Sequence, residues 1–331
     1  MELKVNDEFS YNDIVPTIYS IPHPFLKPFQ VISINRNNKK PKVSVIVPIF
    51  NKERIISEVL DKLIGSLTTD YELIIINDAS TDNSKIIVTD YLKNKNITHI
   101  FVSTTVPIFE TACDNLGFFL AEGFYLLEVQ SDMIINDQGF DKRMISALDA
   151  NEFSSVSGRS CHSWFDLLSK KKKILNVLKL YSPISLLIYG TNPVGYVESG
   201  MYDNKLSEFP LIGDIYTADT NCRGPWLINK TLLNKIGPLD TDSFFNGFDD
   251  HDFNLRGAKM KLSSGYTPVL FTCDSSEGSG NQTKSGVNKK IFEYFCKNKL
   301  IHQKKKITGK NKFIEILAMQ SATRPKKIKN Y

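Results

Sequence analysis

The sequence has few cysteines and no closely spaced pair of them. Structural zinc sites of the finger or ribbon type need such pairs, so the sequence excludes that class of protein. We expect reduced thiols and a cytosol-like compartment. The five cysteines are Cys113, Cys161, Cys222, Cys273 and Cys296.

Long hydrophobic runs and a secretory signal are also missing. The longest apolar stretches, at 124–127 and 184–189, fall far short of the roughly 18 residues that span a bilayer. The first residues, MELKVNDEFSYND, carry acids and lack the basic start and apolar core of a signal peptide. These absences predict a cytoplasmic protein without a transmembrane segment.

The overall composition is that of a globular protein. Hydrophobic residues make up 41% and charged residues 23% of the chain, which excludes a disordered or fibrous protein. A length of 331 residues suffices for one large α/β domain with extensions, or for two modest domains.

Positive charge gathers in the C-terminal tail. From Lys284 onward, fourteen Lys or Arg face only two acids, Glu293 and Glu315. The tail lacks the interleaved aromatics of a nucleic-acid stacking platform, so we expect no nucleic-acid partner. Peripheral contact with an anionic membrane or with a phosphorylated acceptor stays open.

Hydrophobic periodicity predicts alternating strands and helices after residue 42. Residues 1–41 show neither period for long and predict an extended arm. The continuously apolar run VSVIV predicts a buried strand of a parallel sheet. The succession predicts a Rossmann-like, doubly wound α/β sheet. The expected strands are 43–47, 71–76, 97–102, 124–129 and 265–271, with a further strand and helix in 226–236, and the other helices are 55–63, 81–92, 107–121, 139–150 and 249–258.

Polar residues follow three of these strands directly. Because parallel strands end at one edge of a sheet, we expect these side chains to meet in one crevice, where open α/β sheets bind ligands. The residues are Pro48 and Asn51 after the first strand, Asn77 and Asp78 after the second, and Gln130, Ser131 and Asp132 after the fourth.

Four motifs in this order resemble the family 2 glycosyltransferases, which have the GT-A fold and invert the anomeric centre. The resemblance covers about 42–280, and any one motif alone would be weak. It implies a nucleotide-binding half (42–135), an acceptor half (136–280) with an insertion at 159–218, and a basic helical extension at 281–331. The motifs are VSVIVPIFNKE, ELIIINDASTDNS, ACDNLGFFLAEGFYLLEVQSDM, and RGPWLINKTLLNKIGPLD with FFNGFDDHDFNLRG.

The resemblance implies a nucleotide-sugar donor, with a UDP-sugar as the first choice. Asp78 takes the position that recognises the base. The alternative is a helix N-cap, for which Ser80 is the better candidate. The implied donor residues are Pro48, Asn51, Glu53, Asp78, Asn115, Gln130, Ser131 and Asp132.

The resemblance further implies a metal, Mn²⁺ or Mg²⁺, held by Asp132. Such hard cations prefer oxygen ligands. Gln130 replaces the first Asp of the usual motif, which removes a negative charge and predicts weaker metal affinity. The His that often completes the site is missing from LFTCDSSEGSG, where Asp274 or Cys273 could substitute.

Asp250 matches the general base of the family, which takes the proton from an acceptor hydroxyl. The alternative for Asp249, Asp250 and Asp252 is a group of acids that stabilises a helix N-terminus. His251 is interpreted as a solvent-facing neighbour of the base rather than a metal ligand.

Three acceptor-binding residues are expected, namely Trp226, Asp249 and Arg256. Trp226 could stack on a sugar or belong to the core. Arg256 could hold a phosphate or pair with Asp252 one helical turn away.

The function implied is a metal-dependent, inverting hexosyltransferase of glycan biosynthesis, which acts on a hydroxyl of a glycan, lipid or protein. The alternative is a catalytically impaired relative that binds a nucleotide-sugar or glycan, since Asn77, Gln130 and the missing His depart from the family pattern. A nucleotidyltransferase would need a Gly-rich loop after the first strand, where this chain has PIFNKE.

Overall fold

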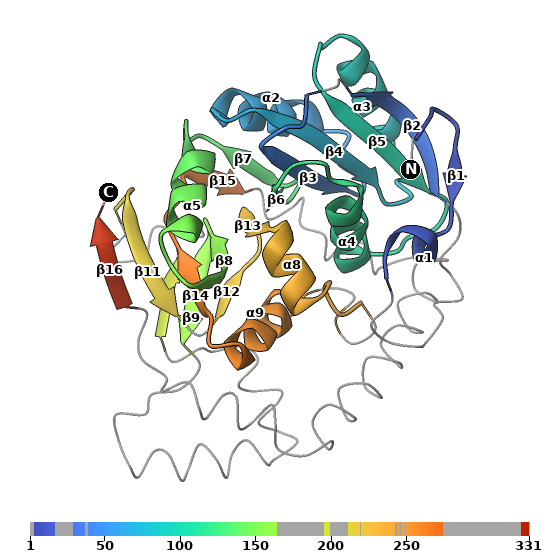
Figure 1. Cartoon of the computed structure of the whole chain (residues 1–331). Coiled ribbons are helices and arrows are strands. Elements are labelled where there is room, and N and C mark those ends of the chain that lie inside the picture. Colours follow the sequence, from blue (N-terminus) through green and yellow to red (C-terminus); the bar gives the residue numbers. More distant parts are fainter. Residues whose placement is uncertain are drawn as a thin grey trace, which may run out of the picture.

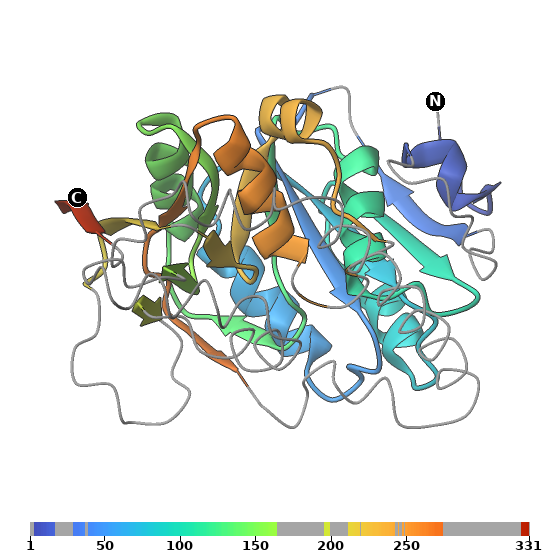
Figure 2. The ribbon, with the colours of Figure 1, turned by 90° about the horizontal axis from the view of Figure 1, so that it is seen from below.

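The structure is a computed structural model, and ten stretches of the chain are described from it. Its main element is one mixed β-sheet (Figure 1). The sheet has eleven strands in the order β1-β2-β5-β4-β3-β6-β13-β8-β14-β11-β16. The N-terminal strands lie at one end of it and β16 at the other, as the view from below also shows (Figure 2). The described residues are 3–16, 29–36, 39–163, 195–198, 211–218, 220–241, 244, 247, 249–273 and 326–330.

The centre of the sheet is parallel, as the alternation of strands and helices predicts. Strands β5, β4, β3 and β6 run parallel to one another, so their carboxyl ends share one edge. Helices α2 and α3 lie on one side of them and α4 on the other (Figure 1). The bounds are β3 (Val43–Ile49), α2 (Ile56–Ser66), β4 (Tyr71–Asn77), α3 (Ser84–Lys93), β5 (His99–Thr104), α4 (Glu110–Leu120) and β6 (Tyr125–Glu128).

The N-terminal segment, which was predicted as an extended arm, contributes strands to this sheet. Strand β2 (Phe29–Asn35) pairs antiparallel with β5, and β1 (Glu8–Phe9) pairs with β2. A short helix, α1 (Tyr11–Ile14), follows β1. In β2 only Phe29 and Val31 are fully buried, so the strand alternates too briefly to stand out in the sequence.

The C-terminal half extends the sheet beyond β6 with mostly antiparallel pairs. Its strands are β8 (Phe153–Ser157), β11 (Asp214–Ala218), β13 (Trp226–Asn229), β14 (Ser263–Tyr266) and β16 (Lys326–Asn330). Helix α5 (Phe140–Asp149) packs on β8, and α8 (Lys230–Ile236) and α9 (Asp249–Lys259) pack against β13 and β14, respectively.

The final strand predicted at 265–271 is two strands in two sheets. Strand β14 ends at Tyr266, and β15 (Phe271–Cys273) pairs antiparallel with β7 (Met133–Ile135). Pro268 lies between them, and proline cannot donate a ladder hydrogen bond, so a single strand breaks there.

The predicted insertion at 159–218 contains strands where it is described. Strands β9 (Ser160–Ser163) and β10 (Gly195–Glu198) form a small sheet with β12 (Thr220–Cys222), and β11 joins the main sheet. Of the basic extension, only β16 is described, and it is a strand at the sheet edge; the helix predicted for the remainder lies outside the described residues. No helix among the described residues is long and apolar enough to cross a membrane.

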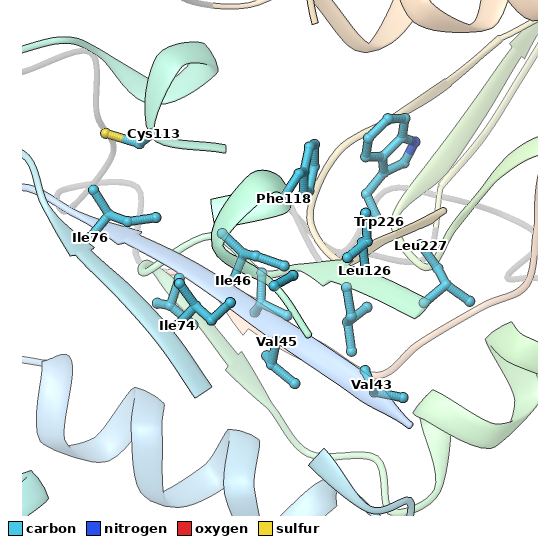
Figure 3. Packing of buried hydrophobic residues seen from close by; sticks show 14 of the residues in the cluster. Val43, Val45, Ile46, Ile74, Ile76, Cys113, Phe118, Leu126, Trp226 and Leu227 are labelled. Atoms are coloured by element: carbon cyan, nitrogen blue, oxygen red, sulfur yellow. The ribbon is translucent and has the colours of Figure 1, made fainter. Parts of the chain in front are cut away.

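Helix α4 packs closely on the central strands and fixes the geometry of the edge (Figure 3). Ile46 and Ile76 are fully buried against it. A Cβ at Gly117 would collide with the side chain of Ile46, so only glycine lets the helix approach β3 this closely. The N-terminus of α4 is thereby held beside the carboxyl ends of β3 and β4.

Candidate active site

A pocket lies where the parallel strands end. It holds about 480 Å³ of space, a figure that includes open solvent. Five of the eight predicted donor-binding residues meet in this pocket, namely Pro48, Asp78, Gln130, Ser131 and Asp132. Residues of the loop after β3 and of α4 complete the lining. The lining residues are Pro48, Ile49, Phe50, Lys52, Asp78, Glu110, Cys113, Gln130, Ser131 and Asp132.

Asp132 presents a buried carboxylate oxygen in this pocket. Its Oδ1 has no hydrogen-bond partner among the described residues. Burial raises the pKa of Asp132, and the negative charge of Glu110 adds to this, while Lys52 and a hydrogen bond with Cys273 lower it. An unpaired buried oxygen is costly, and a bound cation would satisfy it.

Gln130 is held by two charged neighbours. Its amide Nε2 donates to Glu110 at 2.8 Å, and Arg159 donates to its Oε1 at 3.4 Å. The amide oxygen is therefore oriented by contacts from two different elements.

Asp78 organises the start of α4. Its carboxylate accepts hydrogen bonds from the backbone N–H of Ile108 at 2.6 Å and of Phe109 at 3.0 Å. The prediction that Ser80 caps α3 is wrong, because that helix begins at Ser84 and Ser80 Oγ accepts from the N–H of Asn51.

Asn51 and Glu53 clamp two loops together outside the pocket lining. The Asn51 side chain accepts from the Thr81 N–H at 2.8 Å, and Glu53 accepts from the N–H and side chain of Asn83, both at 2.9 Å. Asn115, the third predicted donor residue outside the lining, is buried and exchanges two hydrogen bonds with the backbone of Leu239. The structure thus gives these side chains contacts within the protein.

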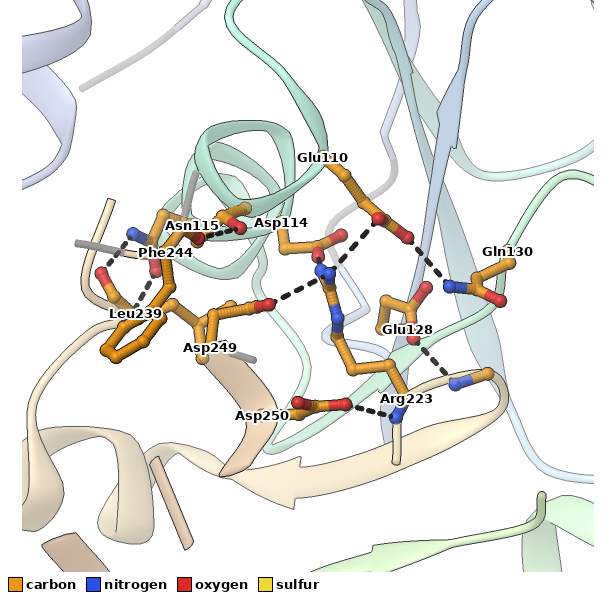
Figure 4. Close-up of polar contacts among 12 residues, drawn as sticks. Glu110, Asp114, Asn115, Glu128, Gln130, Arg223, Leu239, Phe244, Asp249 and Asp250 are labelled. Atoms are coloured by element: carbon orange, nitrogen blue, oxygen red, sulfur yellow. Dashed lines mark hydrogen bonds and ion pairs between the residues drawn. The ribbon is translucent and has the colours of Figure 1, made fainter. Parts of the chain in front are cut away.

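A buried arginine gathers acids from three elements (Figure 4). The Arg223 guanidinium contacts Glu110 at 3.1 Å, Asp249 at 3.0 Å, and Asp114. Glu128 lies beside it and accepts from the Gly224 N–H at 3.1 Å.

Of these residues, the sequence prediction included only Asp249. Two signals were available. Glu110 and Asp114 are four residues apart, on one helix face. Glu128 is a charge inside an apolar strand.

The cluster holds more negative charge than Arg223 can neutralise. Burial raises the pKa of Asp114 to about 7, against the opposing effect of Arg223. Burial likewise raises the pKa of Glu128 and of Asp249 well above the usual range. Part of this group therefore carries protons near neutral pH.

Asp250 is the acid of the cluster that stays ionised. Burial alone would raise its pKa, but His251, Arg223 and two backbone N–H donors together lower it. These donors are the N–H groups of Arg223 at 2.9 Å and of His251 at 2.7 Å. The backbone of Arg223 therefore contacts Asp250, and its side chain contacts the pocket residue Glu110. Arg223 in this way connects the two acids.

The three predicted acceptor residues all lie against other parts of the protein. Trp226 is fully buried between Phe118 and Phe253, and its indole donates to Asn221 at 2.9 Å, which corrects the prediction that it stacks on a sugar. Asp249 has no exposed surface.

Arg256 forms the ion pair with Asp252, one helical turn away, that was the alternative to phosphate binding. It donates to Asp252 at 2.8 Å and to the carbonyls that end α8, among them Ile236 at 2.7 Å. Its guanidinium is therefore used within the fold.

His251, which was predicted to face solvent, is half-buried and contacts two side chains. Its Nδ1 lies 2.9 Å from the Thr220 hydroxyl and its Nε2 lies 3.8 Å from Cys222 Sγ. The predicted metal ligand alternative Cys273 lies beside Asp132, and Asp274 lies outside the described residues.

Comparison with known proteins assigns a family to part of the chain. Residues 44–196 match the model of Glycosyl transferase family 2. This segment is that of a family 2 glycosyltransferase. The mixed, centrally parallel sheet of the chain is the GT-A fold that the sequence motifs implied. In overall architecture the chain is similar to the mannosyltransferase PcManGT of Pyrobaculum calidifontis, solved with GDP-Man and Mn²⁺, at a TM-score of 0.52 and 17% identity over 86% of this chain and 70% of that one.

Curated relatives of this chain match it only over part of their length. The poly(ribitol-phosphate) beta-glucosyltransferase of Bacillus spizizenii is 31% identical over 36% of this chain and 20% of that protein. The poly(ribitol-phosphate) beta-N-acetylglucosaminyltransferase TarS of Staphylococcus aureus is 29% identical over 45% of this chain and 28% of that protein. The first three relatives are covered over 20%, 33% and 57% of their lengths.

Proposed function

We propose that this glycosyltransferase moves a sugar from a UDP-sugar to an acceptor hydroxyl with inversion. The observation that carries the proposal is the pocket itself, where Asp78, Gln130 and Asp132 come together from two parallel strands. The buried, unpartnered Oδ1 of Asp132 fits a divalent cation there. The domain halves proposed are 42–135 for the donor and 136–280 for the acceptor.

In this proposal Asp132 holds Mn²⁺ or Mg²⁺, and Gln130 offers a neutral oxygen beside it. A bound cation of this kind neutralises charge that grows on a diphosphate leaving group. Lys52, buried in the pocket wall, supplies a fixed positive charge toward the same region. Asp78 keeps the N-terminus of α4 in place and faces the pocket where a nucleotide base would lie.

Asp250 is the proposed general base. A base must be ionised before it can accept a proton, and the two N–H donors and neighbouring charges keep this carboxylate anionic. The buried acids Asp114, Glu128 and Asp249 hold Arg223 in position, and the Arg223 backbone in turn positions Asp250.

The first acceptor to test follows from the relatives. Two of them are named for transfer to poly(ribitol-phosphate). A polyanionic acceptor of this type also suits the basic tail, with its excess of Lys over acids after residue 284.

The test is nucleotide release from a panel of UDP-glucose, UDP-GlcNAc, UDP-galactose and GDP-mannose, with Mn²⁺ and poly(ribitol phosphate). We expect acceptor-dependent UDP release from one UDP-sugar. Binding of a UDP-sugar by calorimetry without any release would instead support the alternative, a nucleotide-sugar binding protein. Release only from GDP-mannose would overturn the choice of donor.

A further inference from the structure

The end of β12 and the start of α9 bring together a thiol, a carboxylate and an imidazole. One potential ligand atom each from Cys222, Asp250 and His251 lies within 4.8 Å of the others. We propose that these residues form a second cation site, which selects a borderline transition metal such as Zn²⁺. It differs from the oxygen-lined pocket around Asp132.

The spacing of the two softer ligands fits tetrahedral coordination. With Zn–S of about 2.3 Å and Zn–N of about 2.0–2.1 Å, tetrahedral angles place sulfur and nitrogen about 3.6 Å apart. Cys222 Sγ and His251 Nε2 are 3.8 Å apart. A shift of a few tenths of an ångström would place both on one ion.

The imidazole is oriented by a second contact. Its Nδ1 lies 2.9 Å from the Thr220 hydroxyl. Metal-binding histidines usually have their other ring nitrogen held in this way, because the contact fixes the tautomer and the ring orientation. Here the contact turns Nε2 toward Cys222.

Asp250 keeps lone pairs for a metal despite its two hydrogen bonds. Each oxygen accepts one backbone N–H, from His251 or from Arg223, and a carboxylate oxygen can accept two bonds.

The donor set decides which metal binds. Thiolate and imidazole suit Zn²⁺ and its neighbours, whereas Mg²⁺ and Mn²⁺ prefer all-oxygen sites. Three protein ligands leave a fourth position for water or another oxygen ligand. A Zn²⁺ ion bound at this site uses the carboxylate of Asp250, so Zn²⁺ inhibits sugar transfer. The inhibition rests on the proposed function, whereas binding of the metal does not.

The test uses Co²⁺ as a spectroscopic probe on the full chain. We expect one equivalent of Co²⁺ to give a thiolate-to-metal charge-transfer absorption in the near ultraviolet. Cys222→Ser abolishes this absorption, His251→Gln weakens binding at least tenfold, and Thr220→Val weakens it roughly 10- to 100-fold. Cys161→Ser and Asp132→Asn are the matched controls and retain the absorption.

Circular dichroism and thermal melting of each variant verify its folding. Absorption that persists in folded Cys222→Ser, or that disappears in Cys161→Ser alone, would overturn the site. If the wild type with Co²⁺ shows no thiolate-to-metal absorption, the site does not bind the metal. The contact between Cys222 and His251 is then a hydrogen bond only.

Inhibition separates this site from the proposed function. With Mn²⁺ held constant, the ratio of inhibited to uninhibited rate is compared between wild type and Cys222→Ser, and we expect Zn²⁺ to inhibit only the wild type. If Co²⁺ binds as expected but Zn²⁺ leaves transfer unaffected, the metal site stands and Asp250 is not the base.

Discussion

Arg223 and Asp114 are in direct contact at a place where neither reaches solvent. The side chains are 3% and 0% exposed, and they come from segments more than a hundred residues apart. Asp249 and Glu110 share the same guanidinium. This single cation, which lies between β12 and β13, therefore joins that segment to α4 and α9 beside the pocket.

Replacing Arg223 by Met should destabilise the protein by about 3–5 kcal/mol, because it leaves buried acids without their partner. Urea unfolding gives the free energy directly. Lys39→Met is the matched control: its ion pair with Asp70 is largely exposed, so the loss should stay below about 1 kcal/mol. Equal losses in the two variants would contradict a structural role for the buried cluster.

The stability of the wild type should depend on the protonation of Asp114. Folding raises its pKa from 3.8 to about 7, so the folded state binds more protons in this interval. Its stabilising contribution is complete below pH 3.8 and is lost as pH rises through 7. The slope from one such group is at most about 1.4 kcal/mol per pH unit.

Urea unfolding of wild type and Asp114→Asn across this pH range isolates that contribution. The difference between their unfolding free energies should change between pH 4 and pH 7 and flatten above. Two parallel curves would show that Asp114 titrates normally.

Two glycines in helices on opposite sides of the sheet should respond oppositely to alanine. Gly117→Ala places a methyl group against Ile46, and we expect a loss of about 1–3 kcal/mol. Gly65→Ala has open space around its Cβ and should stabilise α2 by about 0.5–1 kcal/mol. Thermal melting of the two variants tests the close approach of α4 to the sheet. Similar melting temperatures of Gly117→Ala and Gly65→Ala would refute that close approach.

Gln130→Asp should raise Mn²⁺ affinity by about tenfold, or about 1.4 kcal/mol, because it restores a charge beside Asp132. Asp132→Asn should lower the affinity. Calorimetric titration of Mn²⁺ in the presence of UDP measures both. An unchanged or lower affinity in folded Gln130→Asp would place the metal elsewhere.

Asp250→Asn should reduce turnover by about 10²- to 10⁴-fold, because the amide cannot accept the acceptor proton. Nucleotide binding should persist. Asp252→Asn is the matched change in the same helical turn, where it removes the ion pair with Arg256. Near-normal turnover by Asp250→Asn would refute the assignment of the base.

The sequence by itself determined the alternating core and the edge where the pocket lies. Buried runs such as Val43–Ile49 carry a local signal, because a strand covered on both faces is apolar along almost its whole length. The residues at and after the carboxyl ends of such strands follow from connectivity, so Pro48, Asp78 and Asp132 could be expected to meet.

The tertiary structure alone decided what each polar side chain contacts. Trp226 became core, where it packs on Phe118 and Phe253. Asn51 and Asn115 became clamps, because their partners lie 30 and 124 residues away. No local period encodes such pairings. Arg223 and its acids depend on the same long-range contacts, since burial and neighbouring charge, rather than residue type, set which carboxylates stay ionised.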